Sequence, residues 1–179
     1  SRKGEMNVNG NTVQGFQYID KNTKIYFFAE VDKTPEKSGI LSASAVDYNS
    51  QKVEGENAAV VMSFGNMNGS VHVRYGISFI DTDQAKKNLE REIKTYDVNA
   101  VAEAGKAVWN ETLGKIKIQG GSEDDKTVFY TSLYRCYERP ICMSEDGRYY
   151  SAFDGKIHED GGRAFYTDDW IWDTYRATH

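Results

Sequence analysis

The residues best suited to chemistry stand together in residues 165–179, which read FYTDDWIWDTYRATH. These fifteen residues include five aromatic rings, three aspartates and one arginine. A buried core avoids this mixture because an unpaired charge is costly to remove from water, and a solvated face rarely carries two tryptophans. Rings that stack on a sugar and carboxylates that accept hydrogen bonds from its hydroxyls suit a carbohydrate-binding surface. The stretch therefore predicts sugar binding.

Two adjacent residues, Trp172 and Asp173, fit this chemistry best. At the expected start of a helix, the indole would lie against one face of a sugar ring while the carboxylate accepts from its hydroxyls. Arg176 follows Asp173 by three residues, on the same helical face, where it would hold the carboxylate in place. The residue types leave another interpretation equally open, in which Asp173 caps the helix or pairs with Arg176 and Trp172 fills a core.

The composition of the chain limits the kinds of molecule that it is expected to bind. The 179 residues carry a net charge of −5, and only two cysteines, Cys136 and Cys142, are present. This acidity argues against nucleic acid or an anionic membrane surface as a partner, and we expect free thiols. The sequence has no run of about 18 apolar residues, no apolar segment typical of a signal peptide, and no phosphate-binding loop, HExxH or G-x-S-x-G motif.

The elements that must position these side chains change in type along the chain. Residues 14–80 contain five short runs rich in Val, Ile, Tyr and Phe with turn residues between them, which predicts an antiparallel β-sandwich. In the last run, residues 71–80, we expect the apolar alternate positions to face the core: Val71, Val73, Tyr75, Ile77 and Phe79. His72 and Arg74 then fall on the polar side.

Helical patterns follow from Asp81. We expect one helix over residues 82–95, a second from Asp97 to Gly114, and a third that begins at Ser122 and ends by Pro140. A short strand is predicted for residues 115–119. In residues 141–162, two Asp-Gly pairs, at Asp146 and Asp154, predict hairpin turns rather than a metal site, because the spacing of a calcium loop is not met.

The order of several segments resembles one enzyme family. KIYFFAEVDK, VRYGISFIDTDQAKKNLEREI, AVWNETLGKIKIQGG, TVFYTSLY, DGRYYSAFDGKIH and finally FYTDDWIWDTYRATH together are similar to the family-92 glycoside hydrolases, which are α-mannosidases. The resemblance implies an α+β chain with an antiparallel β-sandwich part over residues 1–80, a helical linker over 81–121, and the start of an (α/α)6 helical barrel over 122–179.

The resemblance also implies a calcium-dependent, inverting, exo-acting α-mannosidase of α-1,2 preference that is secreted or periplasmic and acts on mannose-containing glycans. Trp172 and Asp173 then line the mannose subsite, with Asp168 and Arg176 beside them. An inverting glycosidase needs an acid and a base about 6.5–9.5 Å apart, and the family places both, with the calcium ligands, in the remainder of the barrel. We therefore expect no catalytic residue and no turnover from this chain alone.

Two other functions remain open. A β-sandwich with exposed aromatic rings also suits a non-catalytic carbohydrate-binding module, and helical-barrel glycosidases for other sugars use similar aromatic and acidic residues. Turnover of α-mannosides by a longer chain separates the mannosidase from both.

Overall fold

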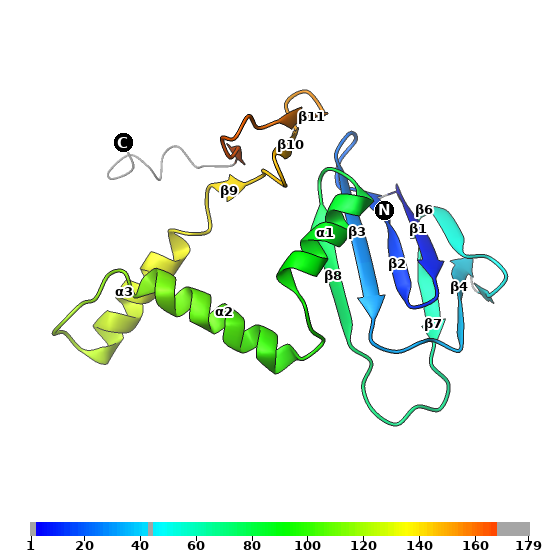
Figure 1. Cartoon of the computed structure of the whole chain (residues 1–179), viewed down its shortest axis with the longest axis horizontal. Helices are drawn as coiled ribbons and strands as arrows, with labels where there is room; N and C mark the ends of the chain where they lie inside the picture. The colour runs from blue at the N-terminus through cyan, green and yellow to red at the C-terminus, as the bar shows by residue number, and fades with distance from the viewer. Residues whose placement is uncertain (1–2, 43–44, 168–179) are drawn as a thin grey trace. The chain divides into compact units, whose positions relative to one another are not determined.

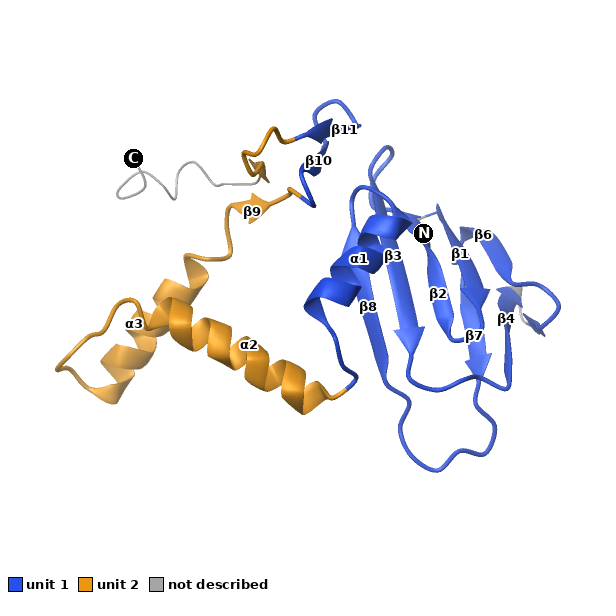
Figure 2. Cartoon of the chain, viewed as in Figure 1, with its two compact units in different colours: residues 1–96, 145–159 blue, residues 97–144, 160–179 orange. Residues whose placement is uncertain are grey.

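A computed structural model describes residues 3–42 and 45–167 of the chain. The chain divides into two compact units, which are coloured separately in Figure 2. The first unit contains residues 1–96 and 145–159, and the second contains residues 97–144 and 160–179. Antiparallel sheets dominate the first unit and helices dominate the second, so the predicted α+β class is confirmed.

The first unit is built on a five-stranded antiparallel sheet with the strand order β6-β1-β2-β3-β8 (Figure 1). Segments rich in Val, Tyr and Phe form its central strands, because these residues have a high β propensity. The bounds are Lys3–Asn9 for β1, Thr12–Tyr18 for β2, Lys24–Val31 for β3, Lys52–Glu56 for β6 and Val73–Ser78 for β8.

A second sheet of three strands has the order β5-β4-β7, with β4 over Lys37–Ser42, β5 over Ala45–Asp47 and β7 over Val60–Ser63. A pocket of about 390 Å³ lies between the two sheets. Its lining is mostly aliphatic and comes from both sheets, the turn between β1 and β2, and the loop between β7 and β8: Asn11, Val13, Ala29, Glu30, Val31, Val60, Met62, Phe64, Val71 and Val73.

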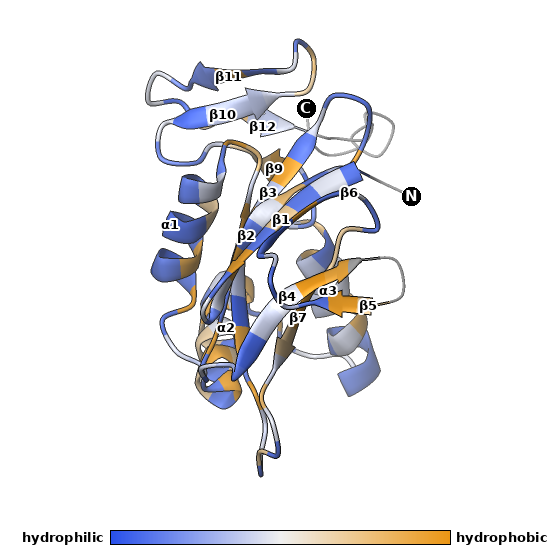
Figure 3. Cartoon of the chain, turned by 90° about the vertical axis from the view of Figure 1, so that its right-hand side faces the viewer, coloured by the Kyte–Doolittle hydropathy of each residue, from blue (hydrophilic) through white to orange (hydrophobic). Residues whose placement is uncertain are grey.

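Helix α1, Thr82–Glu92, packs on the other face of the five-stranded sheet. Ala85 and Leu89 are buried against Phe28, and Ile93 packs at the edge of this cluster. The approach is close because β8 has a glycine here: a Cβ at Gly76 would meet the carbonyl oxygen of Ala85 and lie 2.9 Å from the Cβ of Leu89. The exposed positions of α1 carry charged side chains, among them Lys86, Lys87, Glu90, Arg91 and Glu92, and the helix is largely hydrophilic (Figure 3).

The expected orientation of the strand at residues 71–80 is wrong. Val73, Tyr75 and Ile77 are 60%, 62% and 48% exposed, whereas Gly76 and Ser78 are buried. The alternation of polar and apolar residues shows that a strand has two different faces. Which of them is buried depends on the element that packs against it. A helix needs small residues for a close approach, and only the face with Gly76 offers one.

The second unit contains α2, Val98–Leu113, and α3, Glu123–Arg135. Both begin at the predicted caps: the side chain of Asp97 accepts from the amides of Asn99 and Ala100, and Ser122 forms a capping box with Asp125. Trp109 of α2 packs against Tyr134 of α3, with ring centroids 4.6 Å apart. Neither helix buries a residue. Residues 115–119 form no strand, which corrects that prediction.

We expect Ser122→Ala to weaken α3. The Ser122 hydroxyl accepts from the Asp125 amide at 3.1 Å, and Asp125 accepts from the Ser122 amide at 2.9 Å. Loss of such a cap costs about 0.5–2 kcal/mol. Hydrogen exchange of the first-turn amides of α3 should therefore become faster. Ser132→Ala, at an exposed position of the same helix, is the matched control, and equal exchange in both variants would contradict the capping role.

Candidate functional site

The four predicted sugar-binding residues, Asp168, Trp172, Asp173 and Arg176, lie outside the described residues, so their roles stay predictions. The described chain reaches Thr167, directly before Asp168. The structure describes segments that precede this stretch in the sequence: a two-stranded ribbon in the second unit and, in the first unit, a hairpin with a set of polar contacts on α1.

The ribbon pairs β9, Ile141–Cys142, with β12, Tyr166–Thr167. Two further hydrogen bonds extend it toward the hairpin. The amide of Met143 donates to the carbonyl of Phe165 at 2.8 Å, and the amide of Phe165 donates to the Ser144 hydroxyl at 2.9 Å. The backbone immediately before Asp168 is therefore held in register on the residues that precede Glu145.

The hairpin begins with a tight turn at residues 145–148. Asp146 and Gly147 both have positive φ, 51° and 87°, as in the type I′ turns that favour Asp-Gly, so this predicted turn is confirmed. Strand β10, Arg148–Ser151, then pairs with β11, Lys156–Glu159. In the turn between them, Asp154 accepts hydrogen bonds from the amide of Lys156 and from the Nε2 of His158, at 3.1 and 2.9 Å.

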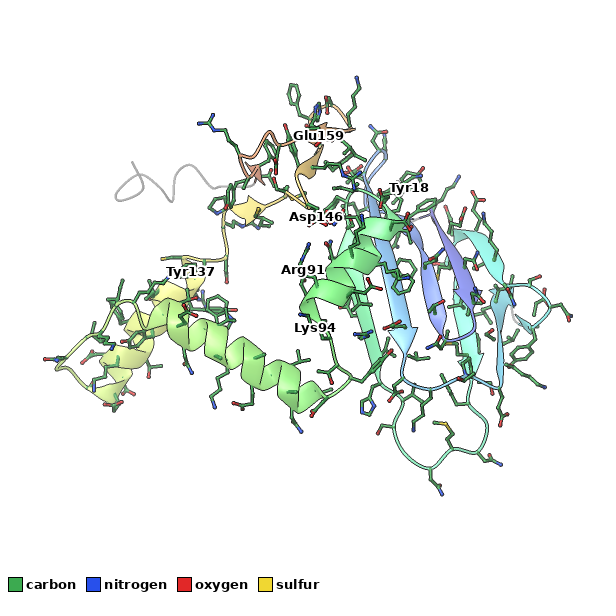
Figure 4. All side chains as sticks on the ribbon, in the orientation of Figure 1. Tyr18, Arg91, Lys94, Tyr137, Asp146 and Glu159 are labelled. Carbon is green, nitrogen blue, oxygen red and sulfur yellow. The ribbon has the colours of Figure 1, made fainter. Side chains whose placement is uncertain are left out.

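Side chains on one face of α1 donate hydrogen bonds to the two carboxylates of this turn, those of Glu145 and Asp146. We call this set of side chains the α1 clamp: Gln84, Asn88, Arg91, Glu145 and Asp146. Gln84 is 1% exposed and Asn88 is 8% exposed. Asp146 accepts from the Nε2 of Gln84 at 2.6 Å and from the Nη1 of Arg91 at 2.6 Å (Arg91 and Asp146 are labelled in Figure 4).

Glu145 completes the α1 clamp with both of its carboxylate oxygens. Oε1 accepts from the amide of Phe79 at 3.1 Å, and Oε2 accepts from the Nδ2 of Asn88 at 2.6 Å. The Oδ1 of Asn88 in turn accepts from the Nε2 of Gln84 at 3.1 Å. Buried amides that lose such partners are left unsatisfied, so these contacts specify where the turn binds.

The hairpin also makes a buried contact with the sheet. The hydroxyl of Tyr150 lies 3.2 Å from that of Thr23, and the Tyr150 ring stacks on Phe79 with centroids 6.3 Å apart. Tyr150 is 9% exposed. An aromatic contact and the α1 clamp thus hold opposite ends of β10.

The contacts of Asp146 make the α1 clamp sensitive to acid. The hydrogen bond from Gln84 and the charge of Arg91 lower the pKa of Asp146 below its usual 3.8, against the opposing effect of burial. A carboxyl group with a lowered pKa stabilises the fold at neutral pH, and this stabilisation is lost as the pH falls through the folded-state pKa.

We therefore expect the protection of the α1 and β10 amides against hydrogen exchange, relative to their intrinsic rates, to fall below about pH 4. The effect should stay under about 1 kcal/mol, because the side chain of Asp146 is 44% exposed. Asp146→Asn should remove this part of the acid dependence. An unchanged pH profile in that variant would assign the acid sensitivity to other groups.

Within residues 3–42 and 45–167, no three His, Cys, Asp or Glu side chains converge as a metal site requires. Cys136 and Cys142 are both free thiols, as predicted. No helix among the described residues is long and apolar enough to cross a membrane.

Sequence comparison assigns both parts of the chain. Residues 1–78 match the model of the glycosyl hydrolase family 92 N-terminal domain, and residues 84–179 match that of the family 92 catalytic domain. The chain belongs to glycoside hydrolase family 92. A curated relative, described as an uncharacterized secreted glycosidase of Arthroderma benhamiae, is 36% identical over 74 residues, which cover 39% of this chain and 10% of that protein.

Solved structures of family 92 enzymes from Bacteroides thetaiotaomicron share the fold. The inverting mannosidase BT2199 is 26% identical, with a TM-score of 0.81 over 99% of this chain. The α-mannosidase BT3965 is 27% identical, with a TM-score of 0.84 over 98% of it, and has also been solved with mannoimidazole. This chain spans about 25% of the length of each.

The comparison places the hairpin and the α1 clamp within family 92 segments. The sequence predicted the hairpin turns and a helix over residues 82–95, but not the contacts between them through Gln84 and Arg91. A usable signal was present: Gln84 and Asn88 are four residues apart and flank the apolar Ala85 and Leu89, so they lie at the border of the buried face.

Proposed function

We propose that the full-length protein is an exo-acting, inverting glycoside hydrolase that removes terminal α-linked mannose from glycans, with a preference for α-1,2 linkages. The observation that carries the proposal is the match of residues 84–179 to the family 92 catalytic domain, together with structural likeness over almost the whole chain to two mannosidases. The structure of one of them with mannoimidazole supports a mannose-containing substrate.

In this proposal, the present chain supplies part of the mannose subsite. Trp172 stacks on the sugar ring and Asp173 accepts from its hydroxyls, with Asp168 and Arg176 beside them. The general acid, the general base and the calcium ligands come from the remainder of the catalytic barrel. The full-length protein is secreted or periplasmic, which the description of its fungal relative as a secreted glycosidase supports.

The test is hydrolysis by the purified full-length protein of α-1,2-, α-1,3- and α-1,6-linked mannobiose. We expect release of mannose, fastest from the α-1,2 disaccharide. Proton NMR during the first turnovers should show β-mannose as the initial product, as inversion requires. Chelation with EDTA should abolish the activity, and added calcium should restore it.

Other results of this experiment would each contradict a specific part of the proposal. Retained activity after chelation would refute the calcium requirement alone, and α-mannose as the first product would refute inversion. Binding of mannosides without hydrolysis would favour a carbohydrate-binding protein, and hydrolysis of another sugar would keep the glycosidase class but change the substrate. Residues 1–179 alone should show no turnover, since the proposed acid and base are not among them.

A further inference from the structure

The three-stranded sheet covers only part of the five-stranded sheet. β4 contacts β6 and β1, and β7 contacts β1. On the face toward the three-stranded sheet, Val8 of β1 and Val31 of β3 are buried, at 0% and 6% exposed. The same face of β8 is uncovered: Val73, which pairs with Val31, is largely exposed, as are Tyr75 and Ile77. Figure 1 shows β8 at the side of the five-stranded sheet away from β4.

The uncovered side chains do not suit contact with water. A solvated sheet face carries polar residues at alternate positions, whereas the alternate positions of β8 opposite α1 are Val73, Tyr75 and Ile77. Phe27, which pairs with Ile77, continues this surface on β3. We call these four residues the open face. Adjacent apolar side chains at a surface mark an interaction site, so the open face calls for a partner.

The nearby edge of the three-stranded sheet is also unprotected. Within residues 3–42 and 45–167, β7 pairs with β4 alone. The Leu41 amide donates to the Ala59 carbonyl at 3.0 Å, so the alternation of an antiparallel ladder turns the amides of Val60 and Met62 away from β4. Edge strands usually carry charges or proline, as β6 does in KVEGE. Residues 58–64, AAVVMSF, contain neither.

The unprotected edge and the open face are neighbours. The three-stranded sheet runs from β4, over β6 and β1, to β7, whose Val60 and Met62 line the pocket with Val31 and Val73. Neighbouring strands in a sheet are about 4.8 Å apart, and packed sheets are about 10 Å apart. One further strand beside β7 would therefore lie over β3 and β8, where it would close the pocket and cover the open face.

We propose that a β-strand of the full-length protein, from outside residues 1–179, pairs with β7 and packs on the open face. The chain spans about 25% of the length of each of the two mannosidase structures, so most of a protein of that length lies outside these residues. The described part of the second unit offers helices and two short strands, β9 and β12, which pair with each other. The added strand fills the pocket with apolar side chains, and its backbone pairs with the outward amides of β7.

Photo-crosslinking in the full-length protein tests what covers the open face. With Tyr75→benzoylphenylalanine, irradiation joins the ring to the chain that it contacts, and mass spectrometry identifies the joined peptide. We expect a crosslink within one molecule, to a segment outside residues 1–179. The control carries the same replacement at Glu90, an exposed position of α1 on the opposite side of the sheet, and should not reach that segment.

Three other results of the crosslinking would each overturn the proposal. A product of doubled mass would assign the open face to a second copy of the protein. A crosslink to residues 97–179 would assign it to the second unit. Absence of any crosslink at position 75 would leave the open face in water.

Hydrogen exchange of the unmodified full-length protein tests the pairing with β7. We expect the Val60 and Met62 amides to exchange at least about tenfold more slowly than the Lys52 and Glu54 amides, each relative to its intrinsic rate. Lys52 and Glu54 are the matched control, because their amides point away from β1 at the charged edge of β6. Equal exchange at the two edges would overturn the proposal. Neither measurement uses a mannoside, so failure of the proposed function would leave both results unchanged.

Discussion

Replacing Gly76 with alanine is expected to destabilise the sheet domain by forcing α1 away from β8. The added Cβ would meet the carbonyl of Ala85, the amide of Leu89 at 2.8 Å and the Cβ of Leu89 at 2.9 Å. Two of these three atoms belong to the backbone of α1, so no side-chain rotation relieves the overlap, and α1 must move off the sheet. Overpacking of this kind costs about 1–3 kcal/mol, and we expect the upper half of that range.

The measurement is thermal unfolding combined with hydrogen exchange of α1. For a domain of this size, a loss of about 2 kcal/mol lowers Tm by roughly 4–8 °C, and the α1 amides should lose protection first. The matched control is Gly105→Ala in α2, where no atom lies within 4 Å of the added Cβ. That change should stabilise its helix by up to about 1 kcal/mol. Equal effects of the two substitutions would show that α1 does not depend on the close approach at Gly76.

The helix starts could be predicted from sequence because their causes are local. Asp81, Asp97 and Ser122 each accept a hydrogen bond from an amide two or three residues ahead. Such a contact needs no distant partner, so residue type and spacing suffice. The same holds for the turn at Asp146 and Gly147, whose positive φ angles follow from the Asp-Gly pair itself.

The errors arose where the outcome depends on distant residues. The strand over residues 71–80 was recognised, but its covered face is decided by α1, which packs over Gly76. Residues 115–119 alternate like a strand yet have no strand to pair with in the part of the chain that the structure describes. Such pairing cannot be judged from a short window of sequence.

The α1 clamp escaped prediction for the same reason. Its hydrogen-bonded pairs are far apart in the sequence: Gln84 and Asp146 are 62 residues apart, and Asn88 and Glu145 are 57 residues apart. Each residue has a plausible local role, in a helix cap, on a solvated face or in a turn. Only the fold shows that these roles coincide at one place, whereas the sugar-binding interpretation of residues 165–179 came from unusual composition within one short stretch.

The largest loss of function is expected when Asp173 or Trp172 is replaced in the full-length protein. If Asp173 accepts from sugar hydroxyls as proposed, such a hydrogen bond contributes about 1.5–3 kcal/mol, and Asp173→Asn should lower kcat/KM by roughly ten- to a hundredfold. Trp172→Ala removes the stacking surface and should be at least as damaging. Steady-state hydrolysis of mannobiose measures both effects, and inhibition by mannoimidazole reports binding at the mannose subsite separately from leaving-group chemistry.

Asp124→Asn is the matched control, because Asp124 is an exposed carboxylate in the first turn of α3. It should leave both kcat/KM and mannoimidazole inhibition unchanged. If Asp173 binds mannose, the inhibition constant should rise in parallel with KM in Asp173→Asn, since both ligands place a sugar ring against the same carboxylate. If Asp173 only caps a helix or pairs with Arg176, the variant should lose thermal stability while both constants stay at their wild-type values. Binding and stability thus respond in opposite patterns, and the two interpretations that sequence alone left open become separable.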